Sequence, residues 1–231
     1  MNFDLQKKLY SYLSAAVTDE RLALFNRIIE NRTNYITVVL EDIFQAQNAS
    51  AVLRSCDCTG IQQIHIIENR NRFQVDTEVA MGSSKWLSLH TYNNSGNKSL
   101  QALQNLKSQG YRIVATTPHK NDVELPDFDI EKGKFALVFG TELQGITDTV
   151  VENADEFLKI PMFGFTESYN ISVSAAIVLY QLTERLRNAG NINWKLTEEE
   201  KISTKIQWLR NSIRSSPSIE KRFWQDINAQ I

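Results

Sequence analysis

One arginine stands out in this sequence because it interrupts an otherwise regular apolar pattern. The stretch QNASAVLRSCDCTGIQQIHII, residues 47–67, reads as an amphipathic helix that runs into a buried strand, with Arg54 between them. A guanidinium is a fixed positive charge with several N–H donors, so it suits phosphates, carboxylates and carbonyl oxygens. Arg54 could therefore cap strand carbonyls, pair with Asp57 or act on a ligand. The local pattern by itself favours a structural role and leaves all three open.

Three other segments place glycine, hydroxyl and amide groups where predicted strands end. They are ATTPHKN (115–121), VFGTELQGIT (138–147) and KIPMFGFTESYNIS (159–172). In doubly wound sheets ligands bind beyond the carboxyl ends of the strands, so the three segments indicate one shared site. Each also has a structural explanation, because glycines permit turns and Ser168 or Asn170 could cap the following helix. Neither G-x-G-x-x-G after a strand nor a P-loop pattern is present, which disfavours the common nucleotide-binding folds.

The elements that must position these segments alternate between strand and helix patterns. Strands are predicted at residues 35–42, 60–67, 85–92, 111–117, 134–140 and 156–162. Helices are predicted at residues 19–32, from about residue 48, and at 99–110, 170–188, 198–213 and 217–227. This alternation predicts an α/β fold with a mostly parallel sheet and helices on both faces. We expect three parts: a helical N-terminal arm (1–34), the core (35–190) and a helical C-terminal extension (191–231).

The composition is that of an ordinary globular protein, with 231 residues of which 42% are apolar and 23% charged. No apolar run approaches the ~20 residues of a membrane-spanning helix. The N-terminus, MNFDLQKKLYSYL, lacks the apolar core of a signal peptide, so we expect a cytoplasmic protein. Cys56 and Cys58 read as small apolar side chains. The three histidines, His65, His90 and His119, are scattered, and no zinc site is predicted.

Charge is distributed unevenly, although the formal net charge is only −2. Between Lys201 and Arg222, six basic residues are accompanied by Glu220 alone. A phosphate-binding face on an otherwise neutral protein would look like this. A solvated helix surface explains the same residues equally well, so charge alone does not identify a nucleic-acid partner.

The three motifs are more specific together than singly. NASAVLRSCDCTG, LVFGTELQGI and IPMFGFTESYNISVSAAI, in this order and spacing, resemble the signature motifs of the TrmH family of RNA 2′-O-ribose methyltransferases, in the SPOUT class. The resemblance covers roughly residues 35–190. It implies that the C-terminal part of the core is threaded into a deep trefoil knot, a feature nearly absent from proteins in general. It also implies S-adenosylmethionine as methyl donor, no metal, and a homodimer.

The resemblance assigns roles to individual residues. Catalysis is expected from Arg54, Asn48, Glu142, Ser168 and Asn170, and cofactor binding from Thr116, Gly140, Glu142, Gly145, Ile160, Met162 and Tyr169. The family commonly has leucine where this chain has Tyr169. Because a guanidinium stays protonated at neutral pH, a general-base role suits Arg54 poorly. We expect it to hold a neighbouring phosphate and to stabilise the emerging alkoxide.

The segments outside the core indicate the class of RNA. About 34 residues precede the first core strand, too few for the separate RNA-binding domain that ribosomal-RNA relatives usually carry. The resemblance therefore implies tRNA, modified at the D-loop guanosine 18, with ribosomal RNA or non-catalytic RNA binding as alternatives. RNA contacts are expected from Arg21, Arg27, Arg32, Arg185, Arg187, Lys205, Arg210 and Arg214. Val173, Ile177 and Tyr180 fit either the dimer contact or a buried core, and core is favoured for each one singly.

Overall fold

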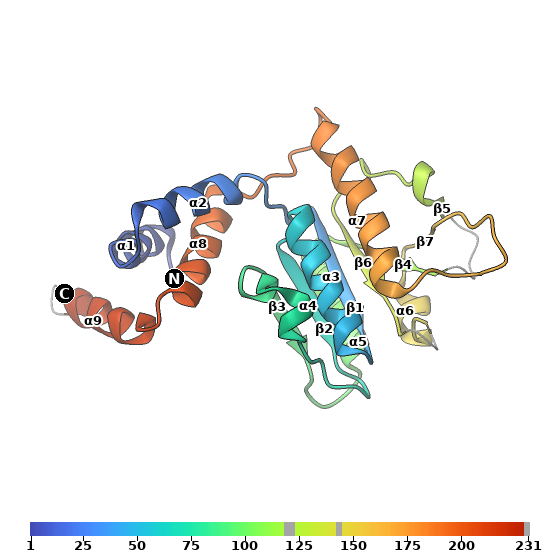
Figure 1. The fold of residues 1–231 in the computed structure, drawn as a ribbon, viewed down its shortest axis with the longest axis horizontal. Coiled ribbons are helices and arrows are strands. Elements are labelled where there is room, and N and C mark those ends of the chain that lie inside the picture. Colours follow the sequence, from blue (N-terminus) through green and yellow to red (C-terminus); the bar gives the residue numbers. More distant parts are fainter. Residues whose placement is uncertain (118–122, 142–144, 229–231) are drawn as a thin grey trace. The chain divides into compact units, whose positions relative to one another are not determined.

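The chain folds into two compact units (Figure 1). The structure is a computed structural model that describes residues 1–117, 123–141 and 145–228. Thr33–Trp194 form the core, and Met1–Arg32 together with Lys195–Ile231 form a helical unit. Across the described ranges, none of the helices combines the length and apolar character that crossing a membrane requires.

The core is built on a sheet of parallel strands. Its described strands are β1 (Ile36–Glu41), β2 (Gln63–Ile67), β3 (Ser88–Tyr92), β4 (Arg112–Thr116), β5 (Val123–Glu124), β6 (Phe135–Phe139) and β7 (Glu156–Lys159). They lie in the order β3-β2-β1-β6-β4-β7-β5, and each neighbouring pair is parallel. The strands therefore all end at one edge, the lower edge in Figure 1. The predicted α/β fold with a mostly parallel sheet is confirmed.

Helices cover both faces of this sheet, because alternate strand residues point to opposite sides. The helical elements of the core are α3 (Ala46–Thr59), α4 (Thr77–Ala80), η1 (Ser83–Lys85), α5 (Lys98–Ser108), η2 (Leu125–Asp127), α6 (Asp148–Asn153) and α7 (Ile171–Asn188). Val38 and Ile64 pack with the buried sides of α3 and α7, which lie next to each other on the near face in Figure 1. Val39 and Ile113 pack with α5 and α6 on the other face. The strand ends remain as the open part of the core.

All six predicted strands are shorter than their apolar patterns, and β2, β3 and β7 differ most, by three residues each. β2 starts at Gln63 because Gly60 ends α3 in the left-handed conformation, with φ 82°. β3 starts at Ser88 because the residues before it form η1, and β7 ends at Lys159 because the chain leaves the ladder there. A segment can be apolar wherever it is buried, but it forms a strand only where its backbone is hydrogen-bonded to a neighbouring strand.

The helical unit joins the two ends of the chain. Its helices are α1 (Phe3–Ser14), α2 (Asp19–Ile29), α8 (Glu198–Ser212) and α9 (Ser216–Asn228). Phe25 of α2 and Trp208 of α8 lie 5.4 Å apart between ring centroids, as do Tyr12 of α1 and Phe223 of α9. The sequence predicts the arm and the extension as separate parts and does not predict α1 as a separate helix. Their packing on each other depends on side-chain fit, which no local pattern reveals.

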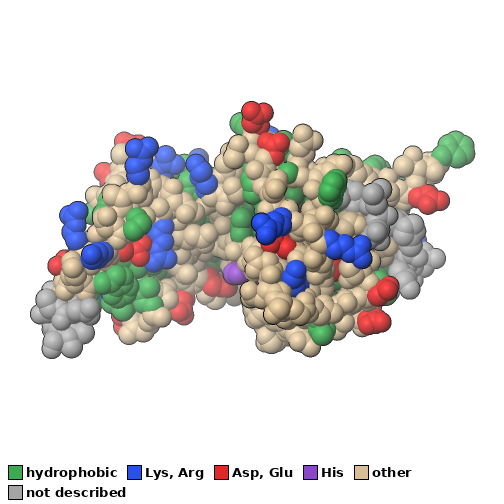
Figure 2. Space-filling view, turned by 90° about the horizontal axis from the view of Figure 1, so that it is seen from below, with side chains coloured by type: hydrophobic (Ala, Val, Ile, Leu, Met, Phe, Trp, Pro, Cys, Tyr) green, Lys and Arg blue, Asp and Glu red, His purple; other side chains and the backbone are tan. Residues whose placement is uncertain are grey.

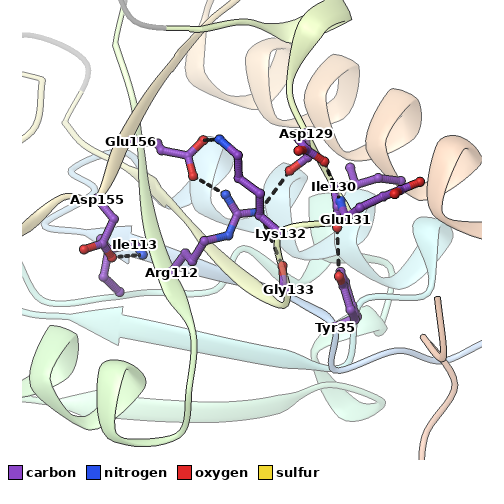
Figure 3. A network of polar contacts seen from close by, with 10 residues as sticks. All are labelled: Tyr35, Arg112, Ile113, Asp129, Ile130, Glu131, Lys132, Gly133, Asp155 and Glu156. Atoms are coloured by element: carbon purple, nitrogen blue, oxygen red, sulfur yellow. Dashed lines mark hydrogen bonds and ion pairs between the residues drawn. The ribbon is translucent and has the colours of Figure 1, made fainter. Parts of the chain in front are cut away.

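The edge where the strands begin is closed by a polar network around Arg112 (Figure 3). The Arg112 guanidinium pairs with the Glu156 carboxylate on neighbouring β7. It also donates to the backbone carbonyls of Asp129, at 3.0 Å, and Gly133, at 3.3 Å. The Tyr35 hydroxyl donates to another carbonyl of the same turn, at 2.8 Å. These contacts fix the turn before β6 at the edge opposite the strand ends.

Candidate functional site

A cavity of about 380 Å³ opens at the edge where β4, β6 and β7 end. The segments that line it are the three that the sequence predicts to form one site, together with the first turns of α7. Among its lining residues are Thr116, Gly140, Gly145, Ile160, Met162, Ser168, Tyr169 and Asn170. The predicted cofactor residues that the structure describes thus all lie at one cavity. Glu142, predicted for both cofactor binding and catalysis, lies outside the described residues.

Two glycines shape the turn that forms one wall of the cavity. Thr141 and Gly145 exchange backbone hydrogen bonds of 2.9 and 3.0 Å, which closes the turn on itself. A side-chain carbon on Gly140 would lie 2.2 Å from the carbonyl oxygen of Gly145, so only glycine fits there. Gly145 adopts φ +69°, a conformation that favours glycine. Both glycines are therefore required by the turn itself, whatever ligand it faces.

The rest of the wall combines apolar side chains with backbone groups. Leu158 and Val178 are buried beneath the cavity, and Ile160 packs against the same core. The Thr116 hydroxyl is occupied, because it donates to the carbonyl of Val138 at 2.8 Å. The polar groups at the cavity are then the backbone amides and carbonyls at the strand ends, together with side chains such as Ser168 and Ser174. Such a wall suits a small ligand with an apolar ring and a polar periphery.

Asn170 connects the start of α7 to the start of α3. Its side-chain oxygen accepts from the Ser172 amide at 2.8 Å, so it is the N-cap of α7. Its side-chain nitrogen donates to the Asn48 side chain at 3.2 Å, and Asn48 in turn donates to Gln45 at 2.9 Å. Asn170 therefore caps the helix and lines the cavity at once. Ser168 also lines the cavity and does not cap α7.

Arg54 lies on α3, exposed, while its neighbours Val52 and Leu53 are buried in the core. No hydrogen bond or ion pair to any part of the described chain holds its guanidinium, so neither strand-carbonyl capping nor pairing with Asp57 is seen. Arg54 is also absent from the lining of the cavity in its own chain. It is a charged side chain available to an external partner.

Three of the predicted RNA contacts have structural roles. Arg185 donates to the carbonyls of Leu125 (3.3 Å) and Phe128, and Arg187 donates to the carbonyl of Thr59 at 2.7 Å. Arg32 is 3% exposed and lies over the Trp208 ring. These contacts occupy donors of Arg185 and Arg187 and bury Arg32, and RNA binding by the three residues stays a prediction. A basic residue on a helix gives no sign in the sequence that a neighbouring carbonyl will take its donors.

The other predicted contacts lie in the helical unit. Lys205 donates to Asn26 at 3.2 Å, and Arg210 holds Glu220 through two hydrogen bonds of 2.7 and 2.8 Å. The Glu220 carboxylate raises the pKa of Arg210. Arg21, Arg27 and Arg214 are exposed. Figure 2 shows Lys and Arg side chains (blue) over this unit, with acidic ones (red) between them.

Apolar side chains near the cavity are exposed to a degree that the sequence does not predict. Val173 is 44% exposed and Tyr180 is 66% exposed, so the core interpretation is wrong for both. Ile177 is partly buried against the core. On the loop before α7, Phe163 is 97% exposed and Phe165 is fully exposed. Val173 and Tyr180 share one helix, and an exposed apolar patch on a helix is typical of a surface that binds a macromolecule.

Comparison with known proteins identifies the family. The family model described as the SpoU rRNA Methylase family matches residues 35–180. The chain belongs to this family. A tRNA (guanosine(18)-2′-O)-methyltransferase of Borreliella burgdorferi is 42% identical to it over 220 residues, covering 95% of this chain and 98% of the relative. The family resemblance read from the three motifs is thereby confirmed.

Solved structures of SpoU proteins share the fold of the core. The A. aeolicus TrmH/SpoU tRNA modifying enzyme matches with a TM-score of 0.75 and 28% identity, over 84% of this chain and 98% of that one. The SpoU methyltransferase AviRb from Streptomyces viridochromogenes, solved in complex with the cofactor AdoMet, matches with a TM-score of 0.56 and 21% identity. That match covers 71% of this chain and 62% of the AviRb chain.

Proposed function

We propose that this SpoU-family chain transfers a methyl group from S-adenosylmethionine to the 2′-hydroxyl of guanosine 18 in the D-loop of tRNA. The observation that carries the proposal is the cavity at the strand ends, which is lined by residues from all three of the strand-end segments that the sequence predicts to form one site. The choice of substrate is supported by the Borreliella burgdorferi relative, which is named for 2′-O-methylation of guanosine 18 in tRNA and whose length the chain covers almost completely. A cytoplasmic location follows from that substrate.

The residues of the cavity fit S-adenosylmethionine. Its volume of about 380 Å³ lies within the range of small-molecule sites. The backbone at Thr116, Gly140 and Ile160 would bind the polar edge of the nucleoside, and apolar side chains would cover its ring. When bound, the molecule supplies an electrophilic methyl group on a sulfonium, which carries its own activation. We propose that the segments around this site form the trefoil knot of the family.

The chain's own residues must then prepare the ribose oxygen. A ribose hydroxyl is a weak nucleophile, so its negative charge has to be stabilised as its proton leaves to solvent. Arg54 is a permanent cation and suits this role together with binding of the adjacent phosphate. The Asn48–Asn170 hydrogen bond holds the starts of α3 and α7 together beside the cavity. Ser168, which also lines the cavity, is placed to bind the substrate or the cofactor's polar end.

Arg54 does not line the cavity of its own chain, so we propose a homodimer in which the partner supplies it. The exposed apolar residues Val173 and Tyr180 on α7 offer the contact surface. They lie seven residues apart, which places them on one side of the helix. α7 also lines the cavity, so a partner bound there would reach the cavity entrance.

Mixed dimers test this arrangement. Arg54→Ala keeps the cavity intact, and Asn170→Ala keeps Arg54, so each variant alone should be inactive. Mixing the two after reversible dissociation should restore part of the activity if Arg54 acts across the interface, because one site per mixed dimer is then complete. No recovery in mixtures shown to contain mixed dimers would place Arg54 within its own chain.

The RNA class is tested by methyl transfer to tRNA and to ribosomal RNA, each isolated from a strain that lacks the gene. Incorporation at guanosine 18 of tRNA is the expected result. Incorporation into ribosomal RNA would favour the other substrate, which gives the SpoU rRNA Methylase family its name. Incorporation into neither, by a folded protein that binds RNA, would favour a non-catalytic role. Among the predicted contacts, Arg21, Arg27, Arg210 and Arg214 are exposed, and Arg210 is paired with Glu220; the other three are the first candidates for binding the RNA backbone.

A further inference from the structure

A buried carboxylate lies behind the cavity, at the last residue of β1. Glu41 is completely buried, with 0% exposure. Its Oε1 accepts hydrogen bonds from the Ser99 hydroxyl at 2.5 Å and the Thr147 hydroxyl at 2.8 Å. Its Oε2 accepts from the Thr147 backbone amide at 2.9 Å. Three donors from two other segments thus converge on one side chain.

The two segments have different relations to the cavity. Thr147 ends the turn that begins at Gly140, and this turn lines the cavity through Gly140, Thr141 and Gly145. Ser99 lies in the first turn of α5, which contributes no residue to the lining. Glu41 therefore ties the cavity turn on one side and a distant helix on the other.

The turn is held at both of its ends. Its first end continues from β6, which is paired with β1 up to Leu40 and Phe139. Its second end has the Glu41–Thr147 contacts, and Thr147 is also the N-cap of α6. The Thr141–Gly145 hydrogen bonds shape the turn between them. Of these contacts, those with Glu41 are the ones in which the side chain of another strand takes part.

We propose that Glu41 is a positioning residue for the cofactor site, acting through Thr147 on the described cavity residues Thr141 and Gly145. The inference rests on the proposed function, since it assumes that this cavity binds S-adenosylmethionine. Glu41 does not touch the cavity, because it is fully buried and absent from its lining. Glu41 instead raises the fraction of molecules in which the cavity wall is arranged to bind S-adenosylmethionine.

This mechanism predicts a change in affinity. When a binding-competent state is only partly populated, the observed dissociation constant rises by the inverse of that population. Without Glu41, the Thr147 amide and hydroxyl lose a buried acceptor, and turn conformations that expose them to water become favourable. If the arrangement of Thr141 and Gly145 that binds is then present in about one molecule in ten, the dissociation constant rises about tenfold.

Three variants separate positioning from general stability. Glu41→Met removes every acceptor and keeps the volume. Glu41→Gln keeps one oxygen that can accept from the Thr147 amide, while its NH₂ group can donate to the two hydroxyls, so it should retain most of the affinity. Ser99→Ala is the matched control, because it removes a hydrogen bond from the same carboxylate on the side away from the cavity.

Calorimetric titration with S-adenosylmethionine, on the full chain without RNA, is the first measurement. We expect the dissociation constant to rise about tenfold in Glu41→Met, and to stay within about threefold of wild type in Glu41→Gln and Ser99→Ala. Thermal midpoints should fall in both Glu41→Met and Ser99→Ala. Equal affinity of wild type and Glu41→Met would overturn the positioning role. A wild-type chain that does not bind S-adenosylmethionine would instead overturn the proposed function.

Hydrogen exchange is the second measurement and does not depend on the cofactor. The amides of Gly145 and Thr147, both hydrogen-bonded in the structure, should exchange faster in Glu41→Met than in Ser99→Ala. Should Glu41→Met fail to fold, Thr147→Val supplies a second test: it removes the hydroxyl that donates to Glu41, and with it the side-chain cap of α6, while the Thr147 amide keeps its hydrogen bond to Glu41. Faster exchange of Gly145 together with weaker binding in Thr147→Val supports the inference. Unchanged exchange and affinity in this variant contradict it.

Discussion

The side-chain amide of Asn170 donates a hydrogen bond of 3.2 Å to the side-chain oxygen of Asn48, across 122 positions of the sequence. The same Asn170 side chain caps α7 through its oxygen. One residue thus uses its acceptor for local structure and its donor for a contact between two motifs. The two roles can be separated by substitution, because aspartate keeps an acceptor and lacks the donor.

Asn170→Asp should therefore fold normally and lose activity. Aspartate caps helices as well as asparagine does, so the thermal midpoint should stay close to wild type. Methyl transfer should fall about tenfold or more, equivalent to about 1.4 kcal/mol, because the link to Asn48 is lost. Asn170→Ala is the comparison, since it should also cost about 1 kcal/mol of stability through the missing cap. Wild-type turnover in Asn170→Asp would show that the link is dispensable.

Arg54→Lys and Arg54→Ala test the role of the exposed guanidinium. The free energy of unfolding of each variant should lie within about 0.5 kcal/mol of the wild-type value, because Arg54 is exposed and unpaired within the described chain. Cofactor affinity, measured by calorimetry, should not change, since Arg54 does not line the cavity. Turnover on tRNA should fall about 100-fold or more in both variants, because the planar fork of arginine is not reproduced by lysine. Strong retained turnover in Arg54→Lys alone would show that a positive charge is sufficient.

The sequence predicts the features that follow from the periodicity of apolar residues and from the order of the motifs. It does not predict those that depend on how side chains from distant segments pack together. The continuous apolar runs at residues 35–42 and 134–140 predict β1 and β6 well, because buried parallel strands are apolar on both faces. The three strand-end segments predict the cavity, because strands of one parallel sheet end at the same edge. Glu41 gives no such signal. It reads as the polar end of a strand, and its three donors come from segments far along the chain.

The contacts of the arginines are likewise not predictable from the sequence. Arg185 and Arg187 lie on α7 among residues that suggest a basic surface, yet both donate to backbone carbonyls of the core. Arg54 lies in an apolar setting that suggests a structural role, yet it is exposed. A side chain's charge is visible in the sequence, but its partners depend on which carbonyls the tertiary structure leaves without donors.

The Arg112–Glu156 pair should be important for stability. Both side chains are largely buried, at 17% and 14% exposure, and they lie at the start of the sheet (Figure 3). Glu156→Gln leaves the Arg112 charge without its partner, which we expect to cost about 3 kcal/mol in urea unfolding. Lys132→Ala is the control, because Lys132 is 55% exposed and 3.8 Å from the same carboxylate. It should change stability by less than about 1 kcal/mol. Similar losses in both variants would contradict the burial argument.

Tyr180→Glu should weaken the proposed dimer without unfolding the core. Tyr180 is 66% exposed, so a charge there costs little in an isolated chain but much inside an apolar interface. Analytical ultracentrifugation should show a shift from dimer to monomer, with methyl transfer lost in parallel. Leu89→Glu, on the edge strand β3 and 36% exposed, is the control and should leave the assembly unchanged. A Tyr180→Glu protein that sediments as wild type would place the interface elsewhere.

His65 should make the core less stable in mild acid. Burial, assisted by the neighbouring His90, lowers the pKa of His65 to about 3. Its Nδ1 is within hydrogen-bonding distance of the Tyr92 hydroxyl, 3.0 Å away, and its ring stacks on His90. Between pH 6.5 and 3 the unfolded chain therefore binds a proton that the folded chain does not, and stability falls as pH falls.

The expected size of this effect is measurable above the range where carboxylates titrate. From pH 6.5 to pH 5, His65 alone should reduce the free energy of unfolding by about 1.5 kcal/mol. Urea unfolding of wild type and His65→Gln across this range gives the contribution as the difference between the two slopes. Glutamine can still bond the Tyr92 hydroxyl but cannot titrate, so the variant's curve should be flatter. Parallel curves would mean that the buried ring takes up its proton as readily in the folded chain as in the unfolded one.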